Sequence, residues 1–131
     1  MRIWLAAAVS AAVIASPALA LDLNGYRAQH KMPRLAYSSH LAGIAYEQAR
    51  LMAGRGQIDH KDFIRRIGFA GGTHAENVLV GCADQDCAIR TWAKSAGHRR
   101  NMLRGDVSHY GIASVKSHNG RRYWALELGS E

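Results

Sequence analysis

The apolar residues of this chain are concentrated at its amino terminus. Of the first 20 residues, 16 are apolar, and the apolar run over residues 3–15 follows a single basic residue, Arg2. A short apolar run of this kind, followed by small residues that end at Ala20, is typical of a secretory signal peptide. The run is shorter than the roughly 20 apolar residues that a membrane-spanning helix needs. We therefore predict a signal peptide over residues 1–20, cleavage near Ala20, and a mature domain over residues 21–131.

The rest of the chain has the composition of one small folded domain. After residue 20, 47 of 111 residues are apolar, which is ordinary for a water-soluble domain. About a hundred residues can bury a single core. We predict a secreted or periplasmic monomer without a stable membrane span.

The whole chain carries a formal net charge of +7. In an exported protein that has no nucleic-acid-binding motif, this charge favours anionic envelope material or lipid head groups as partners, and we expect no nucleic acid. A solvated basic surface that only favours solubility is the alternative.

Cys82 and Cys87 are the only cysteines. Disulfides persist in oxidising compartments, and the spacing is not the CxxC of metal sites, so we predict a local disulfide between them. Two reduced thiols are the alternative.

Local patterns predict several helices followed by a β-hairpin. Apolar residues at helical spacing predict helices over 22–31, from Ser38 or Ser39 to a stop at Gly54 and Gly56, over 61–67, and over 84–96 with Gly97 as the C-cap. A further short helical turn is expected over 99–103. A glycine-rich stretch then leads into an extended run over 77–80, and Asn119-Gly120 between two apolar runs predicts a hairpin. Helices first and a hairpin last indicate an α+β fold with a sheet that is at least partly antiparallel.

Four side chains stand out as candidates for chemistry: His60, His74, Glu76 and His98. Each lies in or beside a loop or a glycine-rich segment, where side chains are exposed to ligands. An extended backbone would place His74 and Glu76 on one face, and the predicted C-cap places His98 directly after a helix. No HExxH or CxxC motif is present, so a metal site would have to be assembled from distant segments. A hydrogen-bonded scaffold without any ligand is the alternative.

Short motifs follow one another in a recognisable order along residues 21–131. They are Leu23-Asn24 with Arg27, Asp59-His60, Ala75-Glu76-Asn77-Val78, Trp92-Ala93-Lys94-Ser95-Ala96-Gly97-His98-Arg99 with Asn101-Met102-Leu103, Tyr110-Gly111-Ile112-Ala113 and Tyr123-Trp124. Together they resemble the CAP superfamily, and most closely its small bacterial SCP-like (PR-1-like) extracellular members. The resemblance implies an α-β-α sandwich in which a small antiparallel sheet lies between helical layers.

The resemblance also implies a site. The family cleft gathers two histidines and two acidic residues, and in some members these hold a divalent metal, often zinc. Matched motif by motif, His60 and His98 are the two histidines and Glu76 is one acid. Ser95 stands where larger relatives carry the second acid, and His74 is a weaker candidate for a fourth ligand. We therefore expect zinc or another divalent metal at His60, Glu76 and His98.

Three functions are compatible with these residues. The first, which we favour, is binding of a lipid, sterol, peptide or envelope ligand. The second is a metal-assisted hydrolase, in which metal-bound water or Glu76 as general base attacks a peptide or ester and His98 polarises the carbonyl group. The third is an envelope or host interaction through surface charges such as Arg99-Arg100 and Arg121-Arg122.

Overall fold

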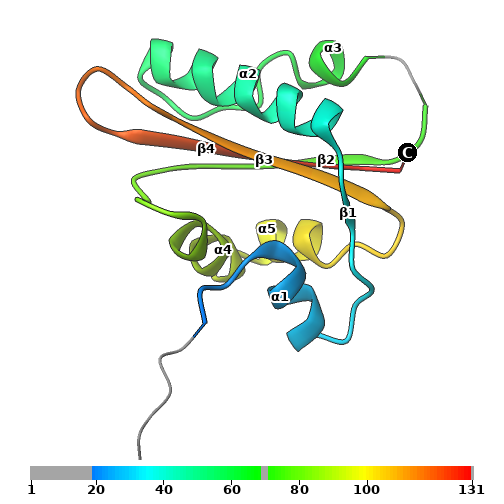
Figure 1. Cartoon of the computed structure of the whole chain (residues 1–131). Coiled ribbons are helices and arrows are strands. Elements are labelled where there is room, and N and C mark those ends of the chain that lie inside the picture. The colour runs from blue at the N-terminus through cyan, green and yellow to red at the C-terminus, as the bar shows by residue number, and fades with distance from the viewer. Residues whose placement is uncertain (1–18, 69–70, 131) are drawn as a thin grey trace, which may run out of the picture.

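The computed structural model describes residues 19–68 and 71–130. Its sheet has the strand order β1-β3-β4-β2 and lies between two layers of helices (Figure 1). In chain order the elements are α1 (Leu23–Gln29), β1 (Ala36–Tyr37), α2 (Ser39–Arg55), α3 (Phe63–Ile67), β2 (His74–Val80), α4 (Gln85–Ala93), α5 (Ala96–Met102), β3 (His109–Lys116) and β4 (Arg122–Gly129). The predicted α+β sandwich is confirmed. Helices α2 and α3 cover one face of the sheet, and α1, α4 and α5 cover the other.

The sheet is mixed, whereas the resemblance implied an antiparallel one. Strands β2, β4 and β3 pair antiparallel as expected, but β1 pairs parallel to β3. Strand β1 has two residues, which is too short for an alternation of apolar and polar residues to be visible in the sequence. No helix in the described part of the chain is long and apolar enough to cross a membrane.

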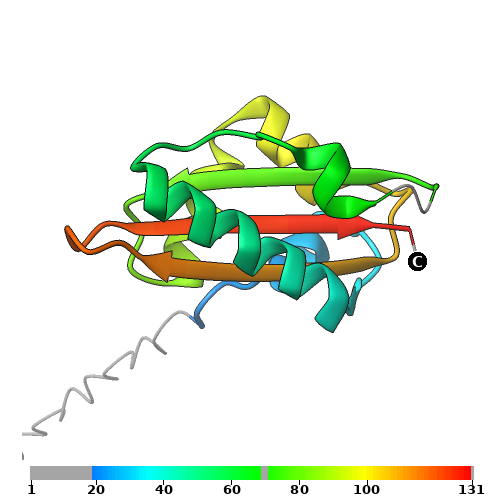
Figure 2. The ribbon, with the colours of Figure 1, turned by 90° about the horizontal axis from the view of Figure 1, so that it is seen from above.

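Helix α2 runs along the sheet (Figure 2), and several alanines are among the buried residues at this contact. The Ser38 side chain caps the helix by accepting a hydrogen bond from the Leu41 amide, and Gly56 ends it with a left-handed φ of 72°. Of the two glycines expected to stop the helix, Gly54 lies within it and Gly56 ends it. At the sheet, a Cβ atom on Gly111 would collide with the backbone nitrogen of Ala42. Only glycine allows this approach of backbone to backbone.

The opposite face is held by buried polar side chains that bind backbone carbonyls. Arg27 is almost fully buried, and its guanidinium donates hydrogen bonds to the carbonyls of Pro33, Met102 and Arg104. Trp92 is fully buried on the same side, and its Nε1 donates to the Val78 carbonyl over 3.1 Å. These contacts join α1 to α5 and α4 to the edge strand β2.

The helix predicted over 84–96 is in fact two helices. Helix α4 ends at Ala93, and Ser95 has an extended backbone with φ −102° and ψ 125° before α5 begins. Gly97 therefore lies inside α5 and is not a C-cap, so His98 lies in the first turn of α5 and not beyond a helix end. Ala96 falls at helical spacing from Trp92, which is why the spacing placed the break at Gly97 and the next helical turn at 99–103.

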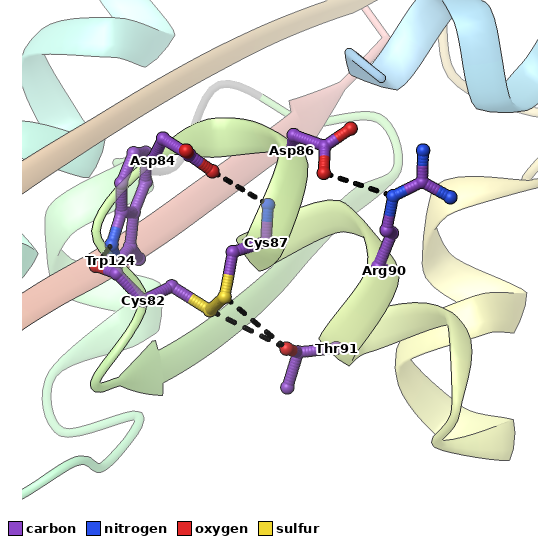
Figure 3. The surroundings of a disulfide bond; sticks show 7 residues. All are labelled: Cys82, Asp84, Asp86, Cys87, Arg90, Thr91 and Trp124. Atoms are coloured by element: carbon purple, nitrogen blue, oxygen red, sulfur yellow. Dashed lines mark hydrogen bonds and ion pairs between the residues drawn. A yellow bond between two sulfur atoms is a disulfide. The ribbon is translucent and has the colours of Figure 1, made fainter. Parts of the chain in front are cut away.

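The predicted disulfide and hairpin are both present. Cys82 and Cys87 are bonded, and Cys87 lies in the first turn of α4, where its amide donates to the capping side chain of Asp84 (Figure 3). The carbonyl of Cys82 accepts a hydrogen bond from the Trp124 indole over 2.8 Å. In the hairpin, Gly120 adopts a φ of 85°, as expected of an Asn-Gly turn.

The contact between α2 and the sheet can be tested at Gly111. A Gly111→Ala substitution forces the α2 backbone away from the sheet, and we expect it to lower the free energy of unfolding by about 1–3 kcal/mol. A Cβ on Gly54, in the same helix, meets nothing within 4 Å, so Gly54→Ala should raise stability by up to about 1 kcal/mol. Urea denaturation of both variants measures this. Equal effects of the two substitutions would contradict the packing argument.

Candidate functional site

Two buried carboxylates form the centre of the candidate site. Glu76 in β2 lies directly opposite Glu127 in β4 in the strand register, and their side chains are only 2% and 1% exposed. Because β2 is an edge strand of the described sheet, groups from both helical layers can reach Glu76. The two carboxylates lie on the side of the sheet that α2 and α3 cover, as their contacts with Gln48 and Arg66 show.

One guanidinium neutralises this pair. Arg66 of α3 places Nη1 2.6 Å from Oε2 of Glu76 and 3.2 Å from Oε1 of Glu127. Its Nη2 donates to Oε1 of Glu76 over 3.2 Å. The Arg66 side chain is itself only 7% exposed. A buried charge is costly unless it is paired, so each member of this cluster depends on the others.

His60 extends the cluster to the surface. Its Nδ1 lies 2.7 Å from Oε1 of Glu76, and its side chain is 54% exposed. Gln48 of α2 supports the loop that carries His60 by donating to the Asp59 carbonyl, and the same amide donates to Glu76 over 3.3 Å. With Nδ1 bound to the carboxylate, Nε2 is the ring nitrogen that remains for solvent or a ligand.

The two carboxyl groups differ in the direction in which their pKa values are shifted. Burial, and then the adjacent Glu76 carboxylate, raise the pKa of Glu127 well above its ordinary value. Burial would also raise the pKa of Glu76, but hydrogen bonds from Glu127, Arg66 and His60 outweigh it and hold that pKa below its ordinary value. Glu127 is therefore the weaker acid of the pair and Glu76 the stronger one.

His98 approaches the same edge from the other helical layer. Its backbone carbonyl accepts a hydrogen bond from Asn77, and Asn101 of the same helix donates to the Asn77 side chain over 2.9 Å. Burial, and then the charge of His60, lower the pKa of His98. His98 thus lies near His60 and Glu76 but contributes no hydrogen bond to them among the described residues.

His74 does not join the cluster. Its Nε2 lies 3.1 Å from the Gly71 carbonyl, and no hydrogen bond connects it to Glu76 in the described chain. It does lie in β2 with Glu76, as the predicted extended backbone requires. The structure therefore brings His60 and Glu76 into contact, places His98 nearby, and leaves His74 apart.

The residues in this arrangement do not fit a divalent cation. Both oxygens of Glu76 are already bound to Arg66, whose permanent positive charge would repel a metal ion. Within residues 19–68 and 71–130, no three His, Cys, Asp or Glu side chains lie together in a way that could hold a metal. The metal at His60, Glu76 and His98 stays a prediction from the resemblance.

Sequence reasoning missed Arg66, Glu127 and Gln48. Arg66 looked like half of a surface Arg-Arg pair, and Gln48 has no distinctive neighbour in the sequence. Glu127 did carry a signal, because it is the one charged residue in the apolar run from Tyr123 to Leu128. A charged residue in the middle of a buried strand needs a partner, and this requirement points to a site.

Comparison with known proteins establishes the family. The Cysteine-rich secretory protein family, CAP, matches residues 22–128, and the chain belongs to this family.

A relative and two solved structures place the domain among bacterial proteins of this fold. An outer surface protein from Borrelia burgdorferi is 17% identical, with a TM-score of 0.74 over 83% of this chain and 86% of that one. An extracellular SCP-domain protein from Bacillus anthracis str. Ames is 21% identical, with a TM-score of 0.68 over 83% of this chain and 38% of that one. The Bacillus subtilis (strain 168) protein YkwD is 24% identical over 102 residues, which are 72% of this chain and 40% of YkwD. This chain thus matches less than half the length of that relative.

The raised pKa of Glu127 predicts how the free energy of unfolding depends on pH. A group whose pKa is raised by folding stabilises the fold at low pH, and this contribution is lost as the pH rises through the raised value. We expect the free energy of unfolding to fall as the pH rises from mildly acidic to alkaline. In Glu127→Gln this fall should be smaller, and the free energy of unfolding near neutral pH should be about 1 kcal/mol higher than in the wild type. Urea denaturation from pH 5 to pH 8 measures both effects.

The exposed Glu47, paired with Arg50 on α2, supplies the control. Glu47→Gln should leave the slope of stability against pH unchanged in this window. A Glu127→Gln protein that keeps the wild-type slope would show that Glu127 is ionised throughout.

Proposed function

We propose that this CAP domain is an extracellular binding domain for a small amphipathic molecule with an anionic head group. The observation that carries the proposal is a hollow of about 590 Å³ beside α3, lined by His60, Asp62, Phe63, Ile64 and Arg65. We call it the α3 hollow. A second hollow of about 420 Å³ also borders α3 on the side of α2 and includes Arg66.

The lining of the α3 hollow is suited to an amphipathic ligand. Ile64 is 58% exposed, so its aliphatic side chain is accessible to a ligand. Phe63 lines the same hollow, so apolar surface is available for an alkyl chain or ring. His60 and Arg65 add hydrogen-bond donors at the same place, and Arg65, 77% exposed, is also paired with Asp62 over 2.7 Å. Ligand sites commonly combine a mainly apolar lining with a few polar groups in this way.

The contacts of Glu76 support binding over catalysis. A general base needs a free oxygen and a raised pKa, but both oxygens of Glu76 accept hydrogen bonds from Arg66, and its pKa is lowered. Ser95, the serine nearest to His98, has its backbone at the start of α5 and no activating base among its described partners. His60, held by Glu76, is better placed to donate or accept a hydrogen bond from a bound ligand.

Binding at the α3 hollow can be tested with a fluorescent long-chain fatty acid as the probe, with a sterol and a peptide as competitors. We expect saturable binding of the fatty acid. Ile64→Asp puts a carboxylate into the apolar lining and should weaken binding at least tenfold, because burying an unpaired charge is costly. Fluorescence titration measures the affinities.

The matched control is Ile58→Asp, at an exposed isoleucine outside the lining of the α3 hollow. It should leave the affinity unchanged. If none of the three ligands binds, or if both variants lose binding equally, the proposed site is wrong.

Zinc titration and activity assays test the two alternatives, the metal site and the hydrolase activity. Because Arg66 neutralises the carboxylates, we expect calorimetric titration with zinc to show no saturable binding to the wild type, and no turnover of peptide or ester panels. Stoichiometric zinc that is lost in His98→Ala would instead support the metal site that the resemblance implies. Turnover that disappears in His60→Ala would support catalysis.

A further inference from the structure

The backbone nitrogen of Leu21 makes an unusual contact with a distant carboxylate. It lies 2.6 Å from Oδ1 of Asp86, which belongs to the first turn of α4 and is 65 residues away along the chain. Leu21 is also the point at which the chain enters the core. Leu19 is 92% exposed, Ala20 is exposed, and Leu21 is 8% exposed with its side chain in the core cluster of Trp92.

This position coincides with the predicted end of the signal peptide. In the full-length chain the Leu21 nitrogen is a neutral amide with one hydrogen. Hydrolysis of the Ala20–Leu21 bond by a signal peptidase adds one water, leaves a carboxylate on Ala20, and leaves an amine on Leu21. The amine takes up a proton near neutral pH, because α-amino groups have pKa values of about 7.7–8.0.

We propose that signal-peptide removal at the Ala20–Leu21 bond creates an α-ammonium group that Asp86 binds, so that processing strengthens the attachment of the amino terminus to α4. The inference rests on the predicted cleavage and is independent of the ligand proposed above. The hydrogen bond from a neutral amide to the Asp86 carboxylate becomes an ion pair with the same donor and acceptor atoms, and the charge on the donor adds a Coulombic attraction that the amide lacks.

The contacts of Asp86 leave it able to bind the Leu21 ammonium group. Its second oxygen, Oδ2, accepts a hydrogen bond from Nε of Arg90 over 2.9 Å, which leaves Oδ1 for the Leu21 nitrogen (Figure 3). The Arg90 contact, and then the Leu21 amide, lower the pKa of Asp86, so the carboxylate is charged at neutral pH. The Cys82–Cys87 disulfide and the Asp84 cap fix the turn that carries Asp86.

The burial of Leu21 means that cleavage at a neighbouring bond would not give the same contacts. If cleavage occurred one residue earlier, the ammonium group would lie on exposed Ala20 and Asp86 would keep only an amide. If it occurred later, the apolar side chain of Leu21 would be lost from the core cluster that contains Leu23 and Tyr26. Cleavage at Ala20–Leu21 alone gives both the buried side chain and the ion pair.

The first experiment determines the amino terminus of the exported protein. The full-length chain is expressed with its own leader in a secreting bacterial host, and the intact mass of the exported product is measured. We expect the mass of residues 21–131 with one disulfide. A product that begins at any other residue overturns the proposal at the processing step.

The second experiment tests the ion pair in the exported protein. A form that retains Ala20 should have a Tm lower than that of the mature protein by about 1–5 °C, the range expected for loss of one partly exposed ion pair in a domain of this size. In the Asp86→Asn background, retention of Ala20 should leave Tm unchanged. The control is Asp106→Asn, which alters an exposed carboxylate paired with Arg104 and should preserve the full effect of Ala20.

A chemical measurement gives a second readout if the Tm differences are small. An α-ammonium group bound to a carboxylate deprotonates less readily, so acylation of the Leu21 amine should be about 3–10-fold slower in the wild type than in Asp86→Asn. Equal acylation rates, or an equal effect of Ala20 on Tm in both backgrounds, would show that Asp86 does not bind the amino terminus.

Discussion

The structure depends on the burial of two carboxylates, Glu76 and Glu127, next to one guanidinium. The strand register places the carboxylates opposite each other, and without a countercharge that arrangement would destabilise the sheet. Arg66 supplies the charge. In helix α3 the apolar residues are at most half-buried and no side chain caps the first turn, so the ion pairs of the buried Arg66 side chain are its main polar attachment to the sheet. The position of the α3 hollow therefore follows from an electrostatic requirement of the sheet.

The same cluster explains why this site differs from the one that the motifs imply. A divalent metal held by carboxylates and imidazoles would neutralise the acidic residues and fix the two segments that carry the histidines. In this chain Arg66 already neutralises Glu76, and Glu76 fixes His60 directly. His98 keeps its place through the hydrogen bonds that join Asn77 to its carbonyl and to Asn101. The motif residues thus have structural partners that require no metal ion.

The sequence was sufficient for features that arise from local physics. The apolar stripe of α2, the Asn-Gly turn and the short cysteine spacing each reflect neighbouring residues, and each predicted element is present. The resemblance supplied the layer order and brought His60 and Glu76 together. It did not supply Arg66, because a short helix with two adjacent arginines gives no indication of which one is buried. The position of the break at Ser95 was not predicted either, since Ala96 falls at helical spacing from Trp92 although it belongs to the next helix.

The two helical layers are attached to the sheet by different means, and this difference bears on where a ligand can be accommodated. On the side of α1, α4 and α5, buried side chains such as Arg27, Asn77 and Trp92 bind backbone carbonyls, so any movement would leave several buried polar groups unpaired. On the other side, the apolar side chains of α3 are at most half-buried, as Phe63 and Ile67 are, and segments with few buried contacts open at low free-energy cost. A ligand that covers Ile64 and Phe63 would add the apolar contacts that α3 lacks. Binding at the α3 hollow should therefore order the least firmly attached helix and leave the rest of the domain unchanged.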